Sequence, residues 1–309
     1  MKTMFKKLSA GIIAIVLASS ALAAYPEKQI TLLVAMGAGG GADKIARVIA
    51  DEIHKNTGVP VVVQNVPGAA GIVATAKYKQ DNSTDGYTIL YVQTGAFLDE
   101  PGQQPRSYSN EDFIPISFPA IVPMCIGVNY KTGVKSFDDL VNLAKIAPNN
   151  LAYASTGPTD TSVKWATKFE KASGTTLLSV PYKAGTQQIM DLVAGVIPMV
   201  ISTCAAQAGP MEGKLSRSVA VTSKNRLPSL PDVPTVSELG YKNTETHMWF
   251  GVFLNKGTPT DVAVNVSNMF NSAVNSEAVK QTVSKMHGTS KVLSLTGAKT
   301  FFDNDIKAQ

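Results

Sequence analysis

The sequence contains few of the residues that build disulfide-rich or metal-bound domains. Its 309 residues include only two cysteines and three histidines, and none of them occurs at the spacing of a zinc site. Cys125 and Cys204 each lie within an apolar run, so two interpretations stay open. They form one disulfide in an oxidising compartment, or they are two small buried side chains. No metal or other cofactor is expected.

Common signatures of catalysis and of nucleic-acid binding are also missing. The chain has no G-x-S-x-G turn and no G-x-x-x-x-G-K-[ST] loop, and its histidines lie outside any H-E-x-x-H segment. Removing the three lysines near the amino terminus lowers the formal net charge from +5 to +2. This charge is too small for a nucleic-acid surface, and no basic cluster accompanies it.

After the first two dozen residues, no apolar run reaches the roughly 18 residues that a membrane span requires. The amino-terminal segment has a basic start, an apolar stretch over residues 8–18 and the triplet Ala21-Leu22-Ala23. These three parts are typical of a signal peptide, residues 1–23, cleaved near Ala23. No cysteine stands at the cleavage point, so a lipid anchor is not expected. We therefore expect an exported, soluble protein.

Glycine is plentiful and is concentrated in turns that follow short apolar runs. Residues 30–36 form such a run, four of the next five residues are glycine, and apolar residues then recur at helical spacing from Asp43 onward. Without Cβ atoms in the turn, the first amides of the helix can approach a ligand, and the helix dipole makes them electropositive. The sequence therefore predicts an anion site at residues 37–42.

This turn also satisfies the G-x-G-x-x-A form of a dinucleotide fingerprint. That fingerprint needs an acidic residue near the end of the second strand, where this sequence has Gln64 and Asn65. A small anion is therefore favoured over a dinucleotide.

A strand, a small polar turn and a helix start recur along the chain. Further strands are expected at residues 59–63, 87–93, 151–155, 177–182 and 199–201. The alternation predicts an α/β fold with parallel sheets, whose ligands bind at the carboxyl ends of the strands. A proline-rich, irregular stretch is expected over residues 97–123, with a crossing to a second domain at 121–128.

Several short motifs together resemble the periplasmic solute-binding proteins of tripartite tricarboxylate transporters, the Bug family. The resemblance covers essentially all of the chain after the signal peptide. The markers are Tyr25-Pro26, Ala38-Gly39-Gly40-Gly41-Ala42-Asp43, Val63-Gln64-Asn65, Pro67-Gly68-Ala69, Asp85-Gly86-Tyr87-Thr88, Tyr153-Ala154-Ser155, Val180-Pro181-Tyr182-Lys183 and Leu230-Pro231-Asp232-Val233-Pro234-Thr235.

The resemblance implies a two-domain Venus flytrap fold, each domain a mostly parallel sheet flanked by helices. Domain 1 would comprise residues 24–123 plus 226–309, and domain 2 residues 124–225. It further implies a monomeric periplasmic protein, not an enzyme, that captures a small carboxylate (a di- or tricarboxylate, hydroxy acid or amino acid) and delivers it to membrane permease subunits. The alternative is an exported enzyme acting on a small organic acid.

By position, the resemblance implies a ligand site formed by helix starts of both domains. The expected residues are Met36, Ala38, Gly39, Gly40, Gly41, Ala42, Asp43, Asn65, Thr94 and Gly95 from domain 1, and Ser155, Thr156, Gly157, Asp160, Tyr182, Lys183, Ala184, Gly185, Thr186, Ser202 and Thr203 from domain 2.

Three residues depart from the family pattern. Met36 stands where Phe is frequent, Asp160 where Ser is common and Val163 where His is common. Two roles stay open for Asp160: it caps the helix that follows it, or it accepts a hydrogen bond from an ammonium or hydroxyl group of the solute.

Overall fold

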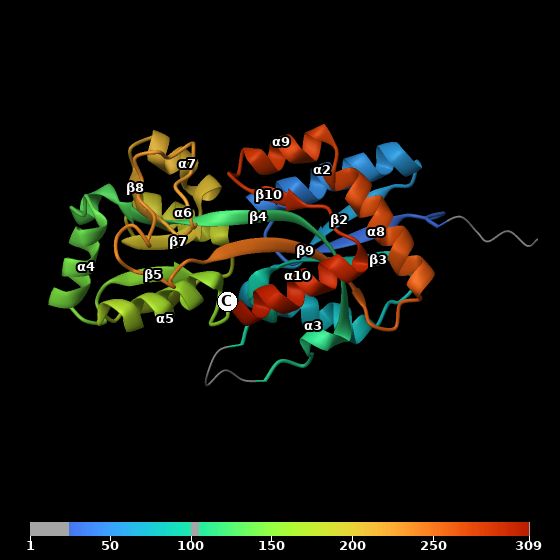
Figure 1. Ribbon diagram of the computed structural model, residues 1–309, viewed down its shortest axis with the longest axis horizontal. Helices are drawn as coiled ribbons and strands as arrows, with labels where there is room; N and C mark the ends of the chain where they lie inside the picture. Colours follow the sequence, from blue (N-terminus) through green and yellow to red (C-terminus); the bar gives the residue numbers. More distant parts are fainter. Residues whose placement is uncertain (1–24, 100–104, 309) are drawn as a thin grey trace, which may run out of the picture.

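The computed structural model describes residues 25–99 and 105–308, so the predicted signal peptide lies outside the described residues. Across those two ranges, no helix has the length and apolar character that crossing a membrane requires. The chain forms an elongated α/β structure in which helices flank a mixed sheet (Figure 1).

The first lobe is built on β1 (Ile30–Val34), which pairs in parallel with β2 (Val61–Asn65) and β3 (Thr88–Gln93). β3 also pairs in antiparallel with β9 (His247–Asn255). The lobe further contains α2 (Gly41–Thr57), α3 (Ile72–Asp81), α8 (Thr260–Val274), α9 (Glu277–Ser284), β10 (Thr289–Lys291) and α10 (Leu295–Ala308).

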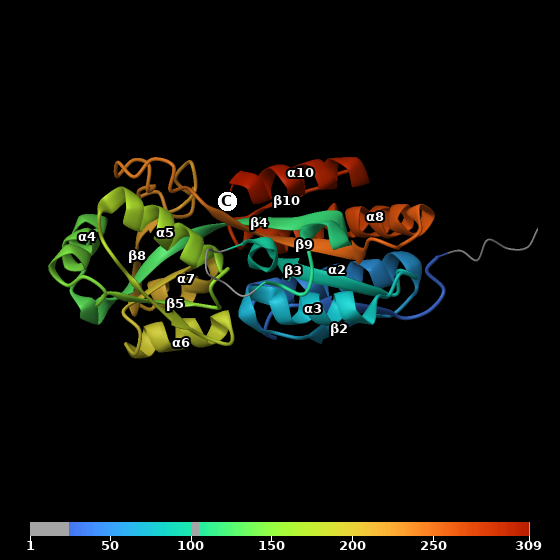
Figure 2. The ribbon, with the colours of Figure 1, turned by 90° about the horizontal axis from the view of Figure 1, so that it is seen from below.

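The second lobe repeats the parallel arrangement on a smaller scale. β5 (Ala152–Ser155) lies between β6 (Leu178–Pro181) and β7 (Met199–Thr203), and both pairings are parallel. The other elements are α4 (Phe137–Ile146), α5 (Thr161–Ser173), α6 (Gly185–Ala194), α7 (Cys204–Glu212) and β8 (Ser216–Val221). The two lobes lie at opposite ends of the long axis (Figure 2).

One long strand, β4 (Phe113–Asn129), runs through both lobes. It pairs with β9 as far as Pro123 and with β7 and β8 from Met124 onward, and all these pairings are antiparallel. The predicted crossing at 121–128 therefore lies within a continuous strand. The expectation of an irregular stretch up to residue 123 was wrong from Phe113 onward. The sheet tolerates Pro115 and Pro119 because the register with β9 shifts there.

The local sequence of α2 determines where the helix ends and which face it buries. Gly58, at a φ of 74°, ends the helix in the left-handed conformation. Ile45, Ile49 and Ile53 are fully buried against the first lobe. Each such side chain contributes about 1.5–3 kcal/mol to folding, so the packing holds the amino end of α2 directly after β1.

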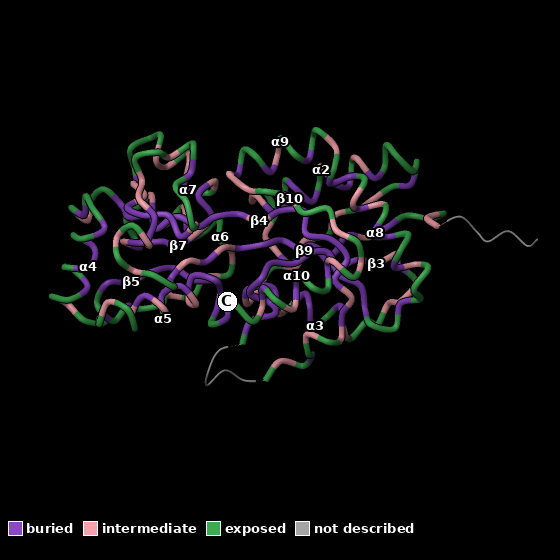
Figure 3. The backbone as a smooth tube through the Cα atoms, in the orientation of Figure 1, coloured by how far each residue is buried: buried purple, intermediate pink, exposed green. Residues whose placement is uncertain are grey.

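The buried residues follow the sheet along the whole length of the molecule (Figure 3). In the first lobe, Phe97, Trp249, Phe253 and Phe302 form an aromatic cluster under α10. In the second lobe, α4 begins with a capping box in which Ser136 and Asp139 each accept a hydrogen bond from the other's backbone amide.

The two cysteines are joined. Cys125 of β4 and Cys204 at the start of α7 form a disulfide, and neither residue is exposed. This contact answers the question that the sequence left open. It ties the crossing strand to a helix whose first turn faces the space between the lobes.

Candidate functional site

A cavity of about 850 Å³ lies between the two lobes. From the first lobe it is lined by the loop after β1, one face of α2, the end of β3, part of β9 and the end of α9. From the second lobe it is lined by the residues around the starts of α5, α6 and α7. Its volume falls within the usual range of small-molecule sites, about 300–1,000 Å³.

The start of α2 is open to a ligand because its N-cap is a glycine. Gly40 carries no side chain, and among the described residues no side chain caps the helix. A Cβ at Gly40 would lie 3.6 Å from the Gly37 carbonyl oxygen and 3.9 Å from the Thr186 Cγ2 atom. The α2 amides therefore face the second lobe across a narrow space.

The start of α6 stands on the opposite side of this space. Its N-cap is Ala184, and within the described ranges no side chain caps this helix either. A Cβ at Gly37 would lie 3.4 Å from the Ala184 Cβ atom, so the two loops approach closely. Two electropositive helix starts, one from each lobe, thus converge at the cavity.

The starts of α5 and α7 differ because their own side chains cap them. Asp160 accepts a hydrogen bond from the Ser162 amide at 3.0 Å, and Thr203 accepts one from the Ala206 amide at 3.4 Å. The other Asp160 oxygen accepts from the amide and the hydroxyl of Thr156. These contacts support the capping role for Asp160, because both of its oxygens already accept hydrogen bonds.

Asp43 and Asn65 support the glycine loop from behind. Asp43 is 3% exposed and accepts hydrogen bonds from the Gly39 amide, Arg47 Nε and Asn65 Nδ2, each at 2.9 Å. Asn65 also donates to the Met36 carbonyl at 3.0 Å. Burial raises the pKa of Asp43, but the bonds from Arg47, Gly39 and Asn65 outweigh it and lower the pKa below its ordinary value.

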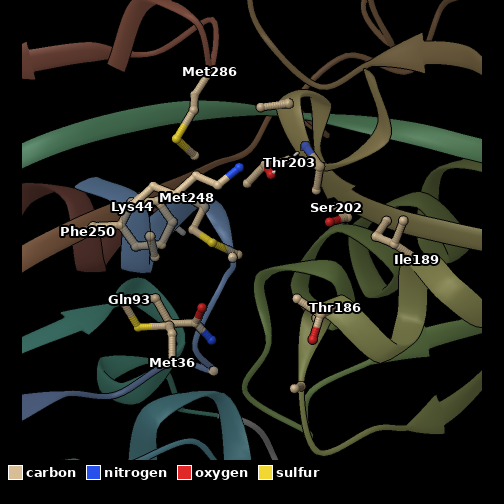
Figure 4. A pocket seen from close by; sticks show the side chains of 18 of the residues that line it. Met36, Lys44, Gln93, Thr186, Ile189, Ser202, Thr203, Met248, Phe250 and Met286 are labelled. Atoms are coloured by element: carbon tan, nitrogen blue, oxygen red, sulfur yellow. Dashed lines mark hydrogen bonds between the residues drawn. The ribbon is translucent and has the colours of Figure 1, made fainter. Parts of the chain in front are cut away.

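The two sides of the cavity present different side chains (Figure 4). The first lobe contributes apolar side chains, Met36, Met248, Phe250 and Met286, together with Gln93 and Lys44. The second lobe contributes the hydroxyls of Thr186, Ser202 and Thr203 next to Ile189. Methionine adapts its shape easily, so this wall can follow the carbon chain of a solute.

The lobes also touch beside the cavity through their main chains. The Ala70 amide of the first lobe donates to the Thr156 carbonyl of the second at 3.0 Å. Ala70 has a φ of 54°, in the left-handed region that few residues other than glycine adopt. This contact holds the two lobes together on one side of the cavity.

Twelve of the residues predicted for the site line the cavity. They are Met36, Gly39, Gly40, Gly41, Ala42, Thr156, Asp160, Ala184, Gly185, Thr186, Ser202 and Thr203.

The other nine predicted residues lie outside the lining, for identifiable reasons. Asp43 and Asn65 hydrogen-bond behind the loop, Thr94 bonds the Trp249 main chain, and Ser155 bonds Ser179. The remaining five are Ala38, Gly95, Gly157, Tyr182 and Lys183. Gly95 packs against Ala70 and Thr159, Gly157 lies beside Ala69, Tyr182 packs against the core of the second lobe, and Ala38 and Lys183 are exposed.

The cavity also contains residues that the sequence did not single out. They are Lys44, Arg47, Val48, Gln93, Gln188, Ile189, Ile201, Ala205, Ala206, Met248, Phe250, Thr282, Lys285 and Met286, whereas Gly37, which also lines the cavity, belongs to the predicted anion site at residues 37–42. Helical spacing from Gly41 could have identified Lys44 and Val48, which follow on the same face of α2. The residues of β9 and α9 have no such signal, because only tertiary packing brings them to the site.

No cluster of histidine, cysteine, aspartate or glutamate suited to a metal ion occurs in residues 25–99 and 105–308. The cavity is instead suited to an anion, through helix starts, hydroxyls and lysines. An α/β fold of two lobes with such a cavity between them defines a solute-binding protein.

The particular family follows from comparison with known proteins. The model of the tripartite tricarboxylate transporter family receptors, TctC, matches residues 45–294, and the chain belongs to this family. Protein BugT of Bordetella pertussis strain Tohama I is 30% identical over 308 residues, which cover 96% of this chain and 93% of BugT.

Two solved structures share the fold. The periplasmic binding protein BugD is 25% identical, with a TM-score of 0.82 over 92% of this chain and 95% of BugD. Rpa4515 of R. palustris, solved with adipate, is 26% identical, with a TM-score of 0.84 over 92% of this chain and 95% of Rpa4515. The protein is therefore a periplasmic solute-binding receptor of the TctC/Bug family with the Venus flytrap fold.

Proposed function

We propose that the protein captures a small carboxylate between its lobes and delivers it to the permease subunits of a tripartite tricarboxylate transporter. The observation that carries this proposal is the pair of helix starts, α2 and α6, which face each other without side-chain caps in the described part of the chain. A carboxylate supplies the acceptors that these amides need. The adipate bound to Rpa4515 supports an organic acid as the solute.

The magnitudes are sufficient for useful binding. A carboxylate gains about 0.3–2 kcal/mol from the dipole of one helix start. Each hydrogen bond to a charged group adds about 1.5–3 kcal/mol. Several such contacts reach the roughly 8 kcal/mol of micromolar affinity after the losses on association. Capture therefore requires no covalent chemistry.

The lobes correspond, in this proposal, to the domains expected from the sequence. Residues 24–123 and 226–309 form the first domain, residues 124–225 form the second, and the protein acts as a monomer. Export precedes capture, with cleavage of the signal peptide near Ala23. Amino-terminal sequencing of protein from the periplasm tests cleavage, and an intact Met1 there contradicts it.

Native mass spectrometry of the purified protein tests the nature of the solute. We expect the protein to retain an unaltered small carboxylate. A retained nucleotide cofactor, or conversion of an added acid into a product, contradicts the proposal and favours an enzyme.

Gly40→Asp tests the position of the site. The new carboxylate would cap α2 and accept the hydrogen bonds from the amides that the solute needs. We therefore expect the folding stability to be kept and solute binding to be lost. Gly40→Ala is the matched control, because a Cβ there makes only ordinary contacts, 3.6 Å or longer. Equal affinity in the Gly40→Asp and wild-type proteins removes the α2 start from the site.

A further inference from the structure

The first residues of β9 face two different parts of the molecule. Met248 and Phe250 line the cavity, whereas Trp249 packs into the aromatic cluster under α10. Because successive side chains of a strand point to opposite faces, His247 lies on the same face as Trp249. One face of this segment is therefore a wall of the cavity, and the other face lies against the carboxyl-terminal helix.

Asp305 of α10 binds both residues on the second face. Its Oδ2 atom accepts a hydrogen bond from the Trp249 indole Nε1 at 2.8 Å. Its Oδ1 atom lies 2.8 Å from His247 Nε2, and because a carboxylate only accepts, this ring nitrogen carries a proton. The Asp305 side chain is only 9% exposed. Asp305 thus connects α10 directly to the strand that lines the cavity.

These side-chain bonds occur where the pairing between β4 and β9 ends. His247 lies opposite Pro123, the last β4 residue that pairs with β9. A proline has no amide hydrogen, so it cannot donate to β9 at this position. From Met124 onward, β4 pairs with β7 and β8 of the second lobe instead. Asp305 therefore supplements the sheet at the end of the cavity wall that lies nearest to the second lobe.

The charged groups around Asp305 come from both lobes, and α10 ends near the boundary between them (Figures 1 and 2). Burial lowers the pKa of Lys168, on α5 of the second lobe, and the charge of Lys164 lowers it further. The carboxylates of Glu245 and Asp305 act on Lys168 in the opposite direction. His247 differs from these groups, because histidine is the residue type that changes its charge between about pH 5 and 8.

We infer that Asp305 is a positioning residue for the solute cavity. By holding His247 and Trp249 on one face of β9, it sets the position of Met248 and Phe250 on the other face. It does so more firmly when His247 is protonated, because the ring then carries a positive charge opposite the carboxylate. The cavity wall thus responds to acidification through the carboxyl-terminal helix. The inference rests on the proposed function in one respect, namely that a solute contacts this wall.

NMR spectroscopy of the mature protein tests the inference without any solute. The methionine methyl groups are labelled with carbon-13, and the Met248 signal is assigned by its loss in Met248→Leu. We expect this signal to shift between about pH 8 and 5.5, with the same midpoint as the ring protons of His247. Asp305→Asn keeps an acceptor for Trp249 and removes the charge. It should reduce the Met248 shift by about half or more, although His247 still titrates.

Hydrogen exchange of the Trp249 indole gives a second measurement. Asp305→Ala removes the acceptor, so the indole hydrogen should exchange about ten- to hundred-fold faster than in the wild type. Asp305→Asn should keep the exchange close to the wild-type rate, because its amide oxygen still accepts from the indole. This difference between the two variants separates the hydrogen bond from the charge.

Two variants serve as controls. Asp303→Asn removes another carboxylate of α10, which pairs with Lys299 at 2.7 Å at the surface, and should leave both measurements unchanged. His287→Gln removes the histidine next to Met286, another methionine of the cavity, and should leave the Met248 shift unchanged.

Several outcomes would overturn the inference. An equal Met248 shift in the wild type and Asp305→Asn means that the His247 charge acts on the methyl group directly through space. No shift in the wild type, or an equal reduction in Asp303→Asn, removes the role of Asp305. Indole exchange that is as slow in Asp305→Ala as in the wild type means that Asp305 does not hold Trp249. None of these outcomes bears on carboxylate capture, which the retained solute decides separately.

Discussion

Asp43 supports the glycine loop only by accepting hydrogen bonds. Its two oxygens receive hydrogen bonds from the Gly39 amide, Arg47 and Asn65. We predict that Asp43→Asn lowers the free energy of unfolding by about 1–3 kcal/mol, because the new amide group turns a donor toward donors. Solute affinity should fall with it, since Gly39 and Gly40 lose their support. Chemical unfolding and calorimetry measure both effects.

Asp51→Asn is the matched control for this prediction. Asp51 lies on the same helix, is exposed, and has no hydrogen bond in the described part of the chain. Its substitution should change stability by no more than about 0.5 kcal/mol. Equal effects of Asp43→Asn and Asp51→Asn would show that the loop does not depend on this network.

The same network makes a prediction about pH. The pKa of Asp43 in the folded protein lies below its ordinary value of 3.8. A lowered pKa means that the charged form stabilises the fold, fully so above the ordinary value, and that this stability is lost as the pH falls through the folded pKa. The difference in melting temperature between wild type and Asp43→Asn should therefore be constant from pH 7 to 5 and shrink below about pH 4. A difference that grows on acidification contradicts this account.

Residues near the glycine loop could be predicted because their signals are local. Gly39, Gly40 and Gly41 reveal the turn through their lack of side chains, and they line the cavity. The role of Asp43 in supporting this loop could not be predicted from the local sequence. Its neighbour in space, Asn65, comes from the next strand, so only the folded chain shows that the two side chains bond each other.

At the scale of elements, the alternation of strands and helices was largely predictable, and the crossing strand was not. Periodicity locates α2, α4 and α8 because each buries one face. Three prolines at 115, 119 and 123 suggested irregular chain, yet β4 passes through them. The pairing with β9 holds β4 in the sheet despite these prolines. Because β9 lies more than 100 residues later in the chain, no local pattern reveals this pairing.

The disulfide links β4 to the first residue of α7. Cys125 and Cys204 are separated by 79 positions, so the bond closes a long loop of the unfolded chain. We predict that replacing both by alanine lowers the free energy of unfolding by about 2–4 kcal/mol, since the unfolded chain regains that freedom. Urea unfolding measures the loss.

A thiol reductant should lower wild-type stability by a similar amount and leave the double variant unchanged. The fold should persist in both cases, because the aromatic cluster of the first lobe contains neither cysteine. Identical urea midpoints for the oxidised wild type and the double variant would mean that the bond adds nothing to stability.

For the whole molecule, a site shared by two lobes predicts a change of shape on binding. A solute held by α2 and α6 favours the closed arrangement by its differential affinity for it. We predict that a bound carboxylate reduces the radius of gyration measured by X-ray scattering. The Gly40→Asp variant should show no reduction at the same solute concentration. Superimposable curves for the wild type with and without a bound solute contradict closure.

The contact between the Ala70 amide and the Thr156 carbonyl involves main-chain atoms only. Replacing a side chain at either position leaves both atoms in place, provided that the backbone keeps its path. The hydrogen bond between the lobes therefore does not depend on which side chains line the cavity. Met248, Met286 and Lys44 line the cavity with their side chains, so substitutions there change what a solute contacts without removing this main-chain hydrogen bond. The solute that the cavity prefers can therefore change while the hydrogen bond that joins the two lobes stays the same.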